Sequence, residues 1–230
     1  MNNSNPAYLA LSRRIDAAAH RAGHDVRLLA VSKTKPAVAI RDVASAGQRA
    51  FGENYVQEAL GKQRELADLG LEWHMIGPLQ SNKCRQVAEH FDWLQSLDRE
   101  KLIAPLIRYR REDKPPLNVL IQVNIDDETS KSGCAPDQID ALAQKIMGSP
   151  RLLLRGLMAI PEPGPDMHKR RRAFARMREL FEALRDRDAS VDTLSMGMSD
   201  DFEIAIEEGA TMVRAGTAVF GTRSPKAGRV

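Results

Sequence analysis

Apolar residues along this chain follow two alternating patterns, one typical of buried strands and one typical of amphipathic helices. The first helical pattern covers residues 5–22 and stops near Gly23. Residues 28–32 then form a nearly continuous apolar run, as expected of a parallel strand that is covered on both faces. Pro36 opens the next helical pattern, and Gly47 ends it. The chain therefore begins with a leading helix, followed by a strand and a second helix.

The same alternation continues to the end of the chain and predicts eight strands. We expect strands at residues 28–32, 49–52, 72–76, 91–96, 117–125, 152–160, 193–195 and 211–217. We expect helices between them at residues 36–46, 55–68, 82–90, 99–110, 136–147, 167–187 and 200–208. Regular alternation of strand and helix indicates a parallel sheet. Eight such units favour an α/β fold, a closed (β/α)8 TIM barrel with an extra N-terminal helix.

An open doubly wound sheet is the alternative fold, but it usually carries a Gly-rich turn after its first strand. Residues 32–36 occupy that turn and contain no glycine. No linker or low-complexity segment interrupts the pattern, and 230 residues is an ordinary length for one barrel. We therefore predict a single domain over residues 1–230, with the leading helix at about 5–22 and the barrel at about 28–222.

Composition narrows the class of protein. Apolar residues make up 43% of the chain and charged residues 28%, which is the balance of a water-soluble globular protein. A net charge of +3 gives no reason to expect a nucleic acid or a membrane surface as partner. Cys84 and Cys134 cannot form a disulfide framework, and the N-terminus lacks the apolar stretch of a secretory signal. We expect a cytoplasmic protein.

Functional groups of such a barrel collect where the strands end and the following loops begin. Lys33 stands at the end of the first strand. Partial burial there would favour the uncharged amine, which can attack an aldehyde. A lysine on a surface loop is the alternative, and spacing alone favours it. Lys35 lies beside Pro36, so we expect its side chain to point outward.

The loop after the seventh strand is a candidate phosphate site. Ser199 is placed to cap the next helix, and Gly197 allows close approach of the backbone. Together they could offer a hydroxyl and N–H groups to a phosphate at a helix N-terminus. A plain helix cap is an equal alternative. Asp200 and Asp201 suit the helix dipole but would have to point away from a bound dianion.

The end of the eighth strand completes this candidate site. Barrel phosphate sites are often built from the loops after strands seven and eight, and Gly216 occupies that place. Arg214 lies on the same strand face, so it should point into the barrel mouth. Because a buried arginine needs a partner, the alternative is a structural ion pair with an interior carboxylate such as Glu53.

Other polar groups carry less information. A lone His74 is more often a satisfied core histidine than a catalyst. No spacing of His, Cys, Asp and Glu resembles a metal site, and no Cys–His nucleophile pair is present. The arginine-rich stretch 169–187 is typical of the solvated face of an outer helix, and so gives little support to a nucleic-acid-binding or scaffold protein.

Six stretches of this sequence together resemble the YggS/PROSC family of pyridoxal phosphate homeostasis proteins. They lie in family order at residues 30–36, 51–58, 73–83, 130–133, 194–201 and 213–217. The resemblance implies that the protein binds pyridoxal 5′-phosphate (PLP) and that Lys33 carries it as a Schiff base. It therefore outweighs the surface-lysine alternative.

The resemblance also implies the other contacts to PLP. Ser199, Gly216 and Thr217 would contact the phosphate. Arg214 would lie near the pyridine nitrogen, and Asn54 near the oxygen side of the ring.

Two features near residue 130 complete the comparison with the family. Lys131 matches a secondary family lysine that can approach the cofactor. Cys134 stands where an aliphatic residue is expected, which is a conservative change for a small buried side chain.

The resemblance implies a role in PLP homeostasis, in which the protein holds PLP and supplies or buffers it without enzymatic turnover. PLP is then the expected partner, with apo PLP-dependent enzymes as candidate recipients, and we expect a monomer that binds neither nucleic acid nor a membrane. The fold is also similar to the N-terminal barrel of alanine racemase, so a PLP-dependent amino-acid racemase is the rival hypothesis.

Two points weigh against the racemase. An arginine opposite the pyridine nitrogen disfavours protonation there and makes the ring a poor electron sink. Racemases of this type tolerate that arrangement but use a second base, a tyrosine from an additional domain of the partner subunit. This chain stops soon after its eighth strand, and its tyrosines are Tyr8, Tyr55 and Tyr109, of which Tyr55 alone starts near the mouth.

Overall fold

Eight parallel strands form a closed barrel, in which each strand pairs with the next and β8 pairs with β1. The structure, a computed structural model, describes residues 5–126, 132–162, 164 and 166–221. The strands are β1 Arg27–Val31, β2 Ala50–Glu53, β3 Glu72–Met75, β4 Trp93–Leu97, β5 Leu117–Gln122, β6 Leu152–Met158, β7 Thr193–Ser195 and β8 Met212–Ala215. The predicted (β/α)8 fold is confirmed.

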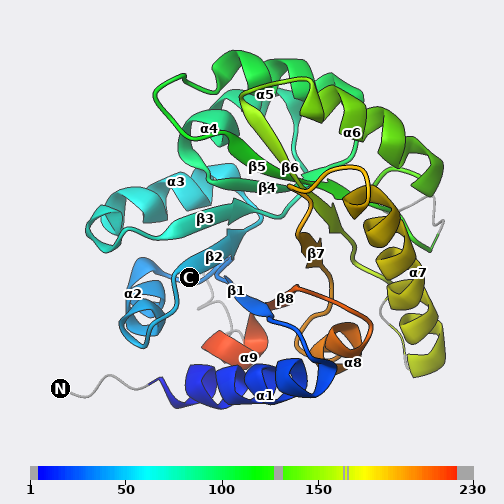
Figure 1. The fold of residues 1–230 in the computed structure, drawn as a ribbon. Helices are drawn as coiled ribbons and strands as arrows, with labels where there is room; N and C mark the ends of the chain where they lie inside the picture. The colour runs from blue at the N-terminus through cyan, green and yellow to red at the C-terminus, as the bar shows by residue number, and fades with distance from the viewer. Residues whose placement is uncertain (1–4, 127–131, 163, 165, 222–230) are drawn as a thin grey trace, which may run out of the picture.

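Helices surround the ring of strands on its outer side (Figure 1). They are α1 Pro6–Ala22, α2 Ala37–Ser45, α3 Val56–Glu65, α4 Cys84–His90, α5 Ile103–Tyr109, α6 Ile139–Met147, α7 Met167–Arg185, α8 Phe202–Glu207 and α9 Thr217–Phe220. Short 3₁₀ turns are η1 Ala67–Leu69, η2 Ser81–Lys83, η3 Glu100–Leu102 and η4 Pro136–Gln138. The sequence did not predict α9, whose four residues are too few for a periodic pattern.

The fifth strand is shorter than its apolar run predicts. It ends at Gln122, although residues 123–125 continue the apolar sequence. The backbone there turns to Cys134 instead: the Asn124 N–H donates to the Cys134 carbonyl, and the Cys134 N–H donates to the Gln122 carbonyl, each at 2.9 Å. Val123 still donates to the Met158 carbonyl at the end of β6, also at 2.9 Å, so the loop pairing takes over only from Asn124.

The leading helix α1 has the ends that the sequence predicts. Asn5 caps it by accepting a hydrogen bond from the Tyr8 N–H, and Gly23 ends it in the left-handed conformation. Its buried face includes Leu11 and Ile15, and it packs against α8 and α9 (Figure 1). The helix therefore covers α8 and α9, which are the helices that follow β7 and β8.

The main hydrophobic core lies between the strands and the helices, whereas the barrel interior is partly polar. Alternating residues of β1 show the two sides: Ala30 belongs to the main core, and Leu29 to a separate small cluster with Ala50 and Met212. Barrel interiors are usually filled by branched aliphatic side chains. Here the buried polar set includes His74, Gln95, Ser195 and Arg214.

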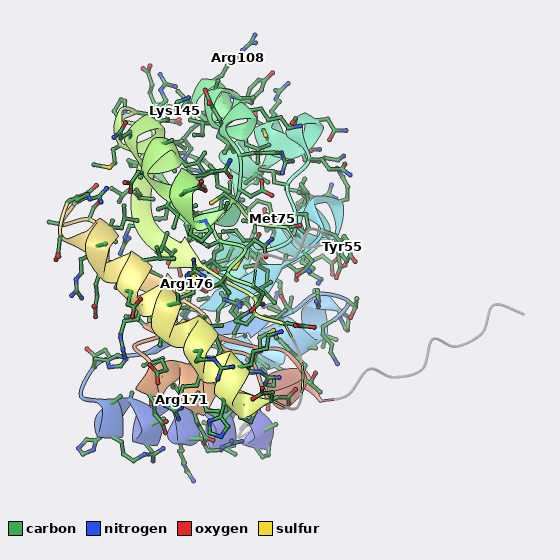
Figure 2. The ribbon with its side chains drawn as sticks, turned by 90° about the vertical axis from the view of Figure 1, so that its right-hand side faces the viewer. Tyr55, Met75, Arg108, Lys145, Arg171 and Arg176 are labelled. Carbon is green, nitrogen blue, oxygen red and sulfur yellow. The ribbon has the colours of Figure 1, made fainter. Side chains whose placement is uncertain are left out.

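The basic helix α7 is an outer helix, as its charge pattern predicts. Phe174 and Met177 lie on its buried face, whereas Arg171 and Arg176 are exposed (Figure 2). Arg171 forms ion pairs with Glu207 and Glu208. Within the described ranges, no helix is both long and apolar enough to cross a bilayer.

Candidate functional site

Four neighbouring strands carry most of the predicted site residues at one rim of the barrel. In a parallel barrel all carboxyl ends of the strands face the same side, and β7, β8, β1 and β2 follow one another around it. The register pairs Ala30 with Ala215 and Val31 with Gly52. Continued to the rim, this register brings Lys33 next to Asn54 on one side and to the loop after β8 on the other.

Lys33 lies in the turn directly after β1. Leu29 faces the barrel interior, and alternation extended through Val31 predicts the same side for Lys33. It is half-buried, and among the described residues its amine forms no hydrogen bond and no ion pair. Lys35, which we expected to point outward, is instead half-buried, and its Nζ lies 3.2 Å from the carbonyl oxygens of Phe220 and Gly221.

Arg214 is a buried cation without a carboxylate partner in the described part of the chain. The residue is only 3% exposed. Its Nη1 lies 2.8 Å from both the carbonyl oxygen and Oγ of Ser195, and its Nη2 lies 2.8 Å from the Ala159 carbonyl oxygen. Burial lowers its pKa to about 10, against an opposing effect of Asp201. A guanidinium has five N–H groups, so some of its donors are left for a ligand.

Glu53 is not the partner of Arg214, so that alternative from the sequence is wrong. Strand β2 turns Glu53 outward, where its Oε1 lies 2.7 Å from Nζ of Lys62 on α3. Asn54 directly follows β2, and alternation extended by one residue predicts the opposite, inward side for it.

A chain of hydrogen bonds crosses the barrel interior below Arg214. Ser195 Oγ accepts from Arg214 and donates to Gln95 Oε1 at 2.8 Å. Gln95 Nε2 donates to His74 Nδ1 at 2.9 Å, and His74 Nε2 lies 2.7 Å from Glu72 Oε1. Every donor has an acceptor if His74 is neutral and carries its proton on Nε2. This interior relay orients Ser195 so that its lone pairs face Arg214.

The electrostatics of the interior relay favour that neutral histidine. Burial lowers the pKa of His74, against the hydrogen bond to Glu72, which raises it. The ring also stacks on Trp93, with centroids 5.0 Å apart. For Glu72, burial raises the pKa, but the hydrogen bonds from His74 and Arg27 and the charge of Arg27 outweigh burial and lower it. The relay thus ends on an ionised carboxylate. His74 is a satisfied core histidine, as predicted.

Backbone donors are free where the phosphate is predicted to bind. The N–H groups of Gly216, Thr217 and Ala218 make no hydrogen bond within the described part of the chain. Gly216 packs tightly on β1: a Cβ built there would lie 3.2 Å from the Val31 carbonyl oxygen. Thr217 is exposed at the start of α9. This rim therefore offers donors to an anion and no room for a side chain at Gly216.

The loop after β7 differs from its prediction at one point. Ser199 does not cap the helix, because α8 begins three residues later, at Phe202, and Asp201 is its N-cap residue. Asp201 accepts from the Met198 N–H at 2.6 Å and pairs with Arg170 at 3.1 Å. The carboxylate is thus occupied within its own loop and by α7. Ser199 is half-buried, and its N–H makes no bond among the described residues.

Asn54 lies at the rim directly after β2, and one atom of its side chain is unsatisfied in the described structure. Its Oδ1 is buried and has no hydrogen-bond partner in the described structure. It borders a cavity of about 470 Å³, at whose edge Tyr55 is 60% exposed (Figure 2). The other lining residues are Val56, Gln57, Met75, Pro78, Leu79, Gln80 and Lys83.

The predicted secondary lysine, Lys131, lies outside the described residues. The neighbouring Ser132 carbonyl accepts from Gln122 Nε2 at 3.1 Å. Cys134 is buried, and burial raises the pKa of its thiol to about 12. The Cys134 side chain therefore serves as a small buried apolar group, in line with its place where the family has an aliphatic residue.

Sequence reasoning missed three supporting residues, Gln95, Ser195 and Lys62. Gln95 lies in the middle of the buried strand β4, where a polar residue is a signal of an interior hydrogen bond. Lys62 follows Val56 and Ala59 at three-residue spacing and so falls on the buried side of α3. A lysine on an apolar helical stripe is the signal that could have identified it.

Comparison with known proteins adds the family. A family model described as alanine racemase, N-terminal domain, matches residues 8–224. A pyridoxal phosphate homeostasis protein of Pseudomonas aeruginosa is 59% identical over 216 residues, which cover 93% of this chain and 93% of that protein.

Solved structures agree with this assignment. PipY of Synechococcus elongatus, with PLP bound, is similar with a TM-score of 0.83 at 38% identity, over 94% of this chain and 99% of that one. Alanine racemase of Corynebacterium glutamicum is similar with a TM-score of 0.63 at 20% identity, over 94% of this chain and 63% of that one. The likeness to the racemase shows a shared barrel fold alone.

Proposed function

The chain belongs to the family of pyridoxal phosphate homeostasis proteins, and from this membership we propose that it binds PLP on Lys33 and buffers or supplies it in the cell. The family predicted from the sequence is thereby confirmed. The PLP-bound structure of PipY supports PLP as the ligand, because that protein is 38% identical over 94% of this chain.

The observation that carries the proposal is the arrangement of complementary groups on four adjacent strands. PLP has an aldehyde, a phosphate, a hydroxyl oxygen attached to the ring and a pyridine nitrogen. The groups that match them in turn are the Lys33 amine, the N–H groups of Gly216 and Thr217, the Asn54 side chain and the Arg214 guanidinium. Among the described residues the first three have no hydrogen-bond partner, and Arg214 has no carboxylate partner. The residues present therefore fit the cofactor.

Each of these residues then has a separate task. When bound, PLP supplies an aldehyde that condenses with an amine to a Schiff base, and Lys33 is the amine at this rim. Gly216, Thr217 and Ser199 would hold the phosphate through hydrogen bonds from N–H and hydroxyl groups. Arg214 would donate to the pyridine nitrogen, which requires that nitrogen to be unprotonated.

We infer that the protein works without enzymatic turnover. A donor from Arg214 keeps the pyridine nitrogen unprotonated, so the ring is a weak electron sink for carbanion chemistry. The racemase hypothesis requires a second base. Tyr55 is the candidate at this rim, but its side chain is exposed at the edge of the cavity beside Asn54, where a base would be poorly shielded from water.

The test follows α-proton exchange of L- and D-amino acids in heavy water by NMR. The protein is first saturated with PLP and desalted, and visible absorbance records the retained cofactor. We expect retained PLP and no exchange at catalytic rates in the wild type. Exchange that requires both PLP and Lys33, and that is lost in Lys33→Ala but kept in Lys35→Ala, would overturn the carrier function in favour of the racemase.

The remaining predictions from the sequence form part of the proposal. We propose a single domain over residues 1–230, a monomer in the cytoplasm, and apo PLP-dependent enzymes as recipients of PLP. We further propose that Lys131 acts as a secondary lysine near the cofactor.

A further inference from the structure

A buried charged cluster lies directly behind the turn that carries Lys33. Its members are Glu53, Glu58 and Lys62, which we call the turn cluster. Lys62 Nζ lies 2.7 Å from Glu53 Oε1 and 2.5 Å from Glu58 Oε1. The Lys62 side chain is 7% exposed and that of Glu53 is 0% exposed. Charged residues are almost never buried so fully without a specific partner or role.

The turn cluster holds both peptide groups that flank the Cα of Lys33. Lys62 Nζ donates its third hydrogen bond to the Ser32 carbonyl oxygen at 2.8 Å. Glu58 Oε1 accepts from the Thr34 N–H at 2.6 Å. The first bond fixes the peptide group before Lys33, and the second fixes the one after it. The direction in which the Lys33 side chain leaves the backbone is therefore set by the turn cluster.

The turn itself is strained. Thr34 has a φ of 65° and is the only non-glycine residue with positive φ in the described ranges. For a β-branched residue this conformation is an outlier that persists only where surrounding contacts impose it. Ser32 supplies a further contact, because its Oγ lies 2.5 Å from Glu53 Oε1. Such strain is typical of functional segments.

We propose that Lys62, together with Glu53 and Glu58, is a positioning residue that holds the Lys33 amine for covalent capture of PLP. In that step the Lys33 nitrogen bonds to the aldehyde carbon, and the aldehyde oxygen leaves as water with the two amine hydrogens. Lys62 itself is not the reacting amine, because all three of its N–H donors are used by the Ser32 carbonyl, Glu53 and Glu58. The inference rests on the proposed function of Lys33.

Positioning has a kinetic signature that distinguishes it from a purely structural ion pair. Misplacing a reacting amine slows the covalent step by up to roughly a hundredfold, even where noncovalent binding is kept. Pyridoxine 5′-phosphate has a hydroxymethyl group in place of the aldehyde, so it reports noncovalent binding alone. A substitution that damages the structure would lower the affinity for both PLP and pyridoxine 5′-phosphate. A substitution that only misplaces the Lys33 amine would slow the capture of PLP and leave the affinity for pyridoxine 5′-phosphate unchanged.

The experiment compares Lys62→Met and Glu58→Ala with the wild type. Stopped-flow absorbance gives the rate of Schiff-base formation, and calorimetry gives the affinity for pyridoxine 5′-phosphate. We expect capture about tenfold to a hundredfold slower in Lys62→Met, with pyridoxine 5′-phosphate affinity kept within about twofold. Glu58→Ala, whose side chain is 30% exposed, should show the same pattern and decides the question if Lys62→Met does not fold.

Ala59→Gly is the matched control. It weakens the same helix, α3, at a buried position but removes no hydrogen bond to the turn. Capture at the wild-type rate in this control, with slow capture in the two cluster variants, supports the proposal. The proposal is overturned if both cluster variants capture PLP at the wild-type rate, or if their affinity for pyridoxine 5′-phosphate falls by the same factor as their capture rate. If the proposed function itself is wrong, the result is different: the wild-type protein then captures no PLP on Lys33.

Hydrogen exchange of the Thr34 amide in the ligand-free protein supplies a second readout. Because this N–H donates to Glu58, Glu58→Ala should raise its exchange rate at least about tenfold. Wild-type exchange at Thr34 in that variant would contradict the claim that the turn cluster holds the turn.

Discussion

At the scale of single residues, the proposed PLP site depends on a few side chains at the rim, of which Arg214 is one. Its guanidinium is buried and bonds to backbone carbonyls and to Ser195, but to no carboxylate in the described structure. No negative charge in the described ranges therefore neutralises it directly at the barrel mouth. Its pKa of about 10 keeps it protonated at neutral pH. In the proposed function, the pyridine nitrogen of PLP accepts a hydrogen bond from this guanidinium through its lone pair.

The phosphate contacts predict a difference between PLP and pyridoxal. Ser199→Ala or Thr217→Val should weaken PLP far more than pyridoxal, which has no phosphate. A hydrogen bond to a charged group contributes about 1.5–3 kcal/mol, which corresponds to roughly a tenfold to hundredfold loss of affinity. Equilibrium titration with both ligands measures this ratio.

Thr211→Val is the matched control for these two variants. Thr211 directly precedes β8, at the opposite end from the rim, where its Oγ1 accepts from the Leu194 N–H. This variant should lose stability while keeping the ratio of PLP to pyridoxal affinity. Equal weakening of both ligands in Ser199→Ala and Thr217→Val would mean that these residues serve the fold and not the phosphate.

His74 predicts a dependence of stability on pH. Its pKa is lowered from 6.5 by burial, so the unfolded chain takes up a proton on this histidine before the folded protein does. The stabilisation from neutral His74 is thus complete above pH 6.5 and falls as the pH drops through the lowered value. Urea unfolding between about pH 7 and about pH 5 should show this loss in the wild type.

His74→Gln supplies the comparison, since a glutamine can still donate to Glu72 and accept from Gln95. Its free energy of unfolding should depend less on pH over the same interval. A variant with the same pH dependence as the wild type would show that His74 is not the titrating group.

At the scale of elements, β6 contains a bulge opposite β5, and at this bulge β6 lies very close to β7. The register between β5 and β6 shifts by one residue, since Val119 pairs with Leu154 and Leu120 with Gly156. Gly156 has a φ of 139°, and a Cβ built on it would lie 2.1 Å from the Thr193 carbonyl oxygen of β7. Glycine is therefore required where the bulge lets β6 approach β7.

Gly156→Ala should accordingly destabilise the barrel. A strained backbone costs roughly 1–3 kcal/mol, and the collision with Thr193 adds to it, so we expect a loss of at least about 2 kcal/mol in the free energy of unfolding. Gly148→Ala is the control, because its φ is −69° and its Cβ would make an ordinary contact. Urea denaturation of the two variants compares them, and equal stabilities would contradict this reading of the bulge.

Sequence periodicity predicts the elements better than it predicts their ends. All eight strands lie where the apolar runs place them, because each run must be buried between the interior and a helix. The ends differ where local hydrogen bonds compete with the apolar pattern. Cys134 pairs with the backbone of Gln122 and Asn124 at the end of β5, and Asp201, as the N-cap residue, places the start of α8 after Ser199. These contacts join residues that no periodic pattern relates.

At the scale of the whole molecule, closure of the barrel explains why distant segments form one rim. Lys33 and Gly216 are far apart in the chain, yet β1 and β8 are neighbours once the sheet closes. The sequence could predict this juxtaposition from eight strand–helix units. It could not predict the interior relay or the turn cluster, because they depend on side chains that face each other across the barrel or between a strand and α3.

The central claim is that Lys33 is the amine that holds PLP, and borohydride trapping tests it most directly. The PLP-saturated protein is reduced, digested and mapped by mass spectrometry, with Lys33→Ala and Lys35→Ala treated in parallel. We predict about one reduced label per chain, located on Lys33, kept in Lys35→Ala and lost in a folded Lys33→Ala. A label found mainly on Lys35 or Lys131 in the wild type would contradict the account.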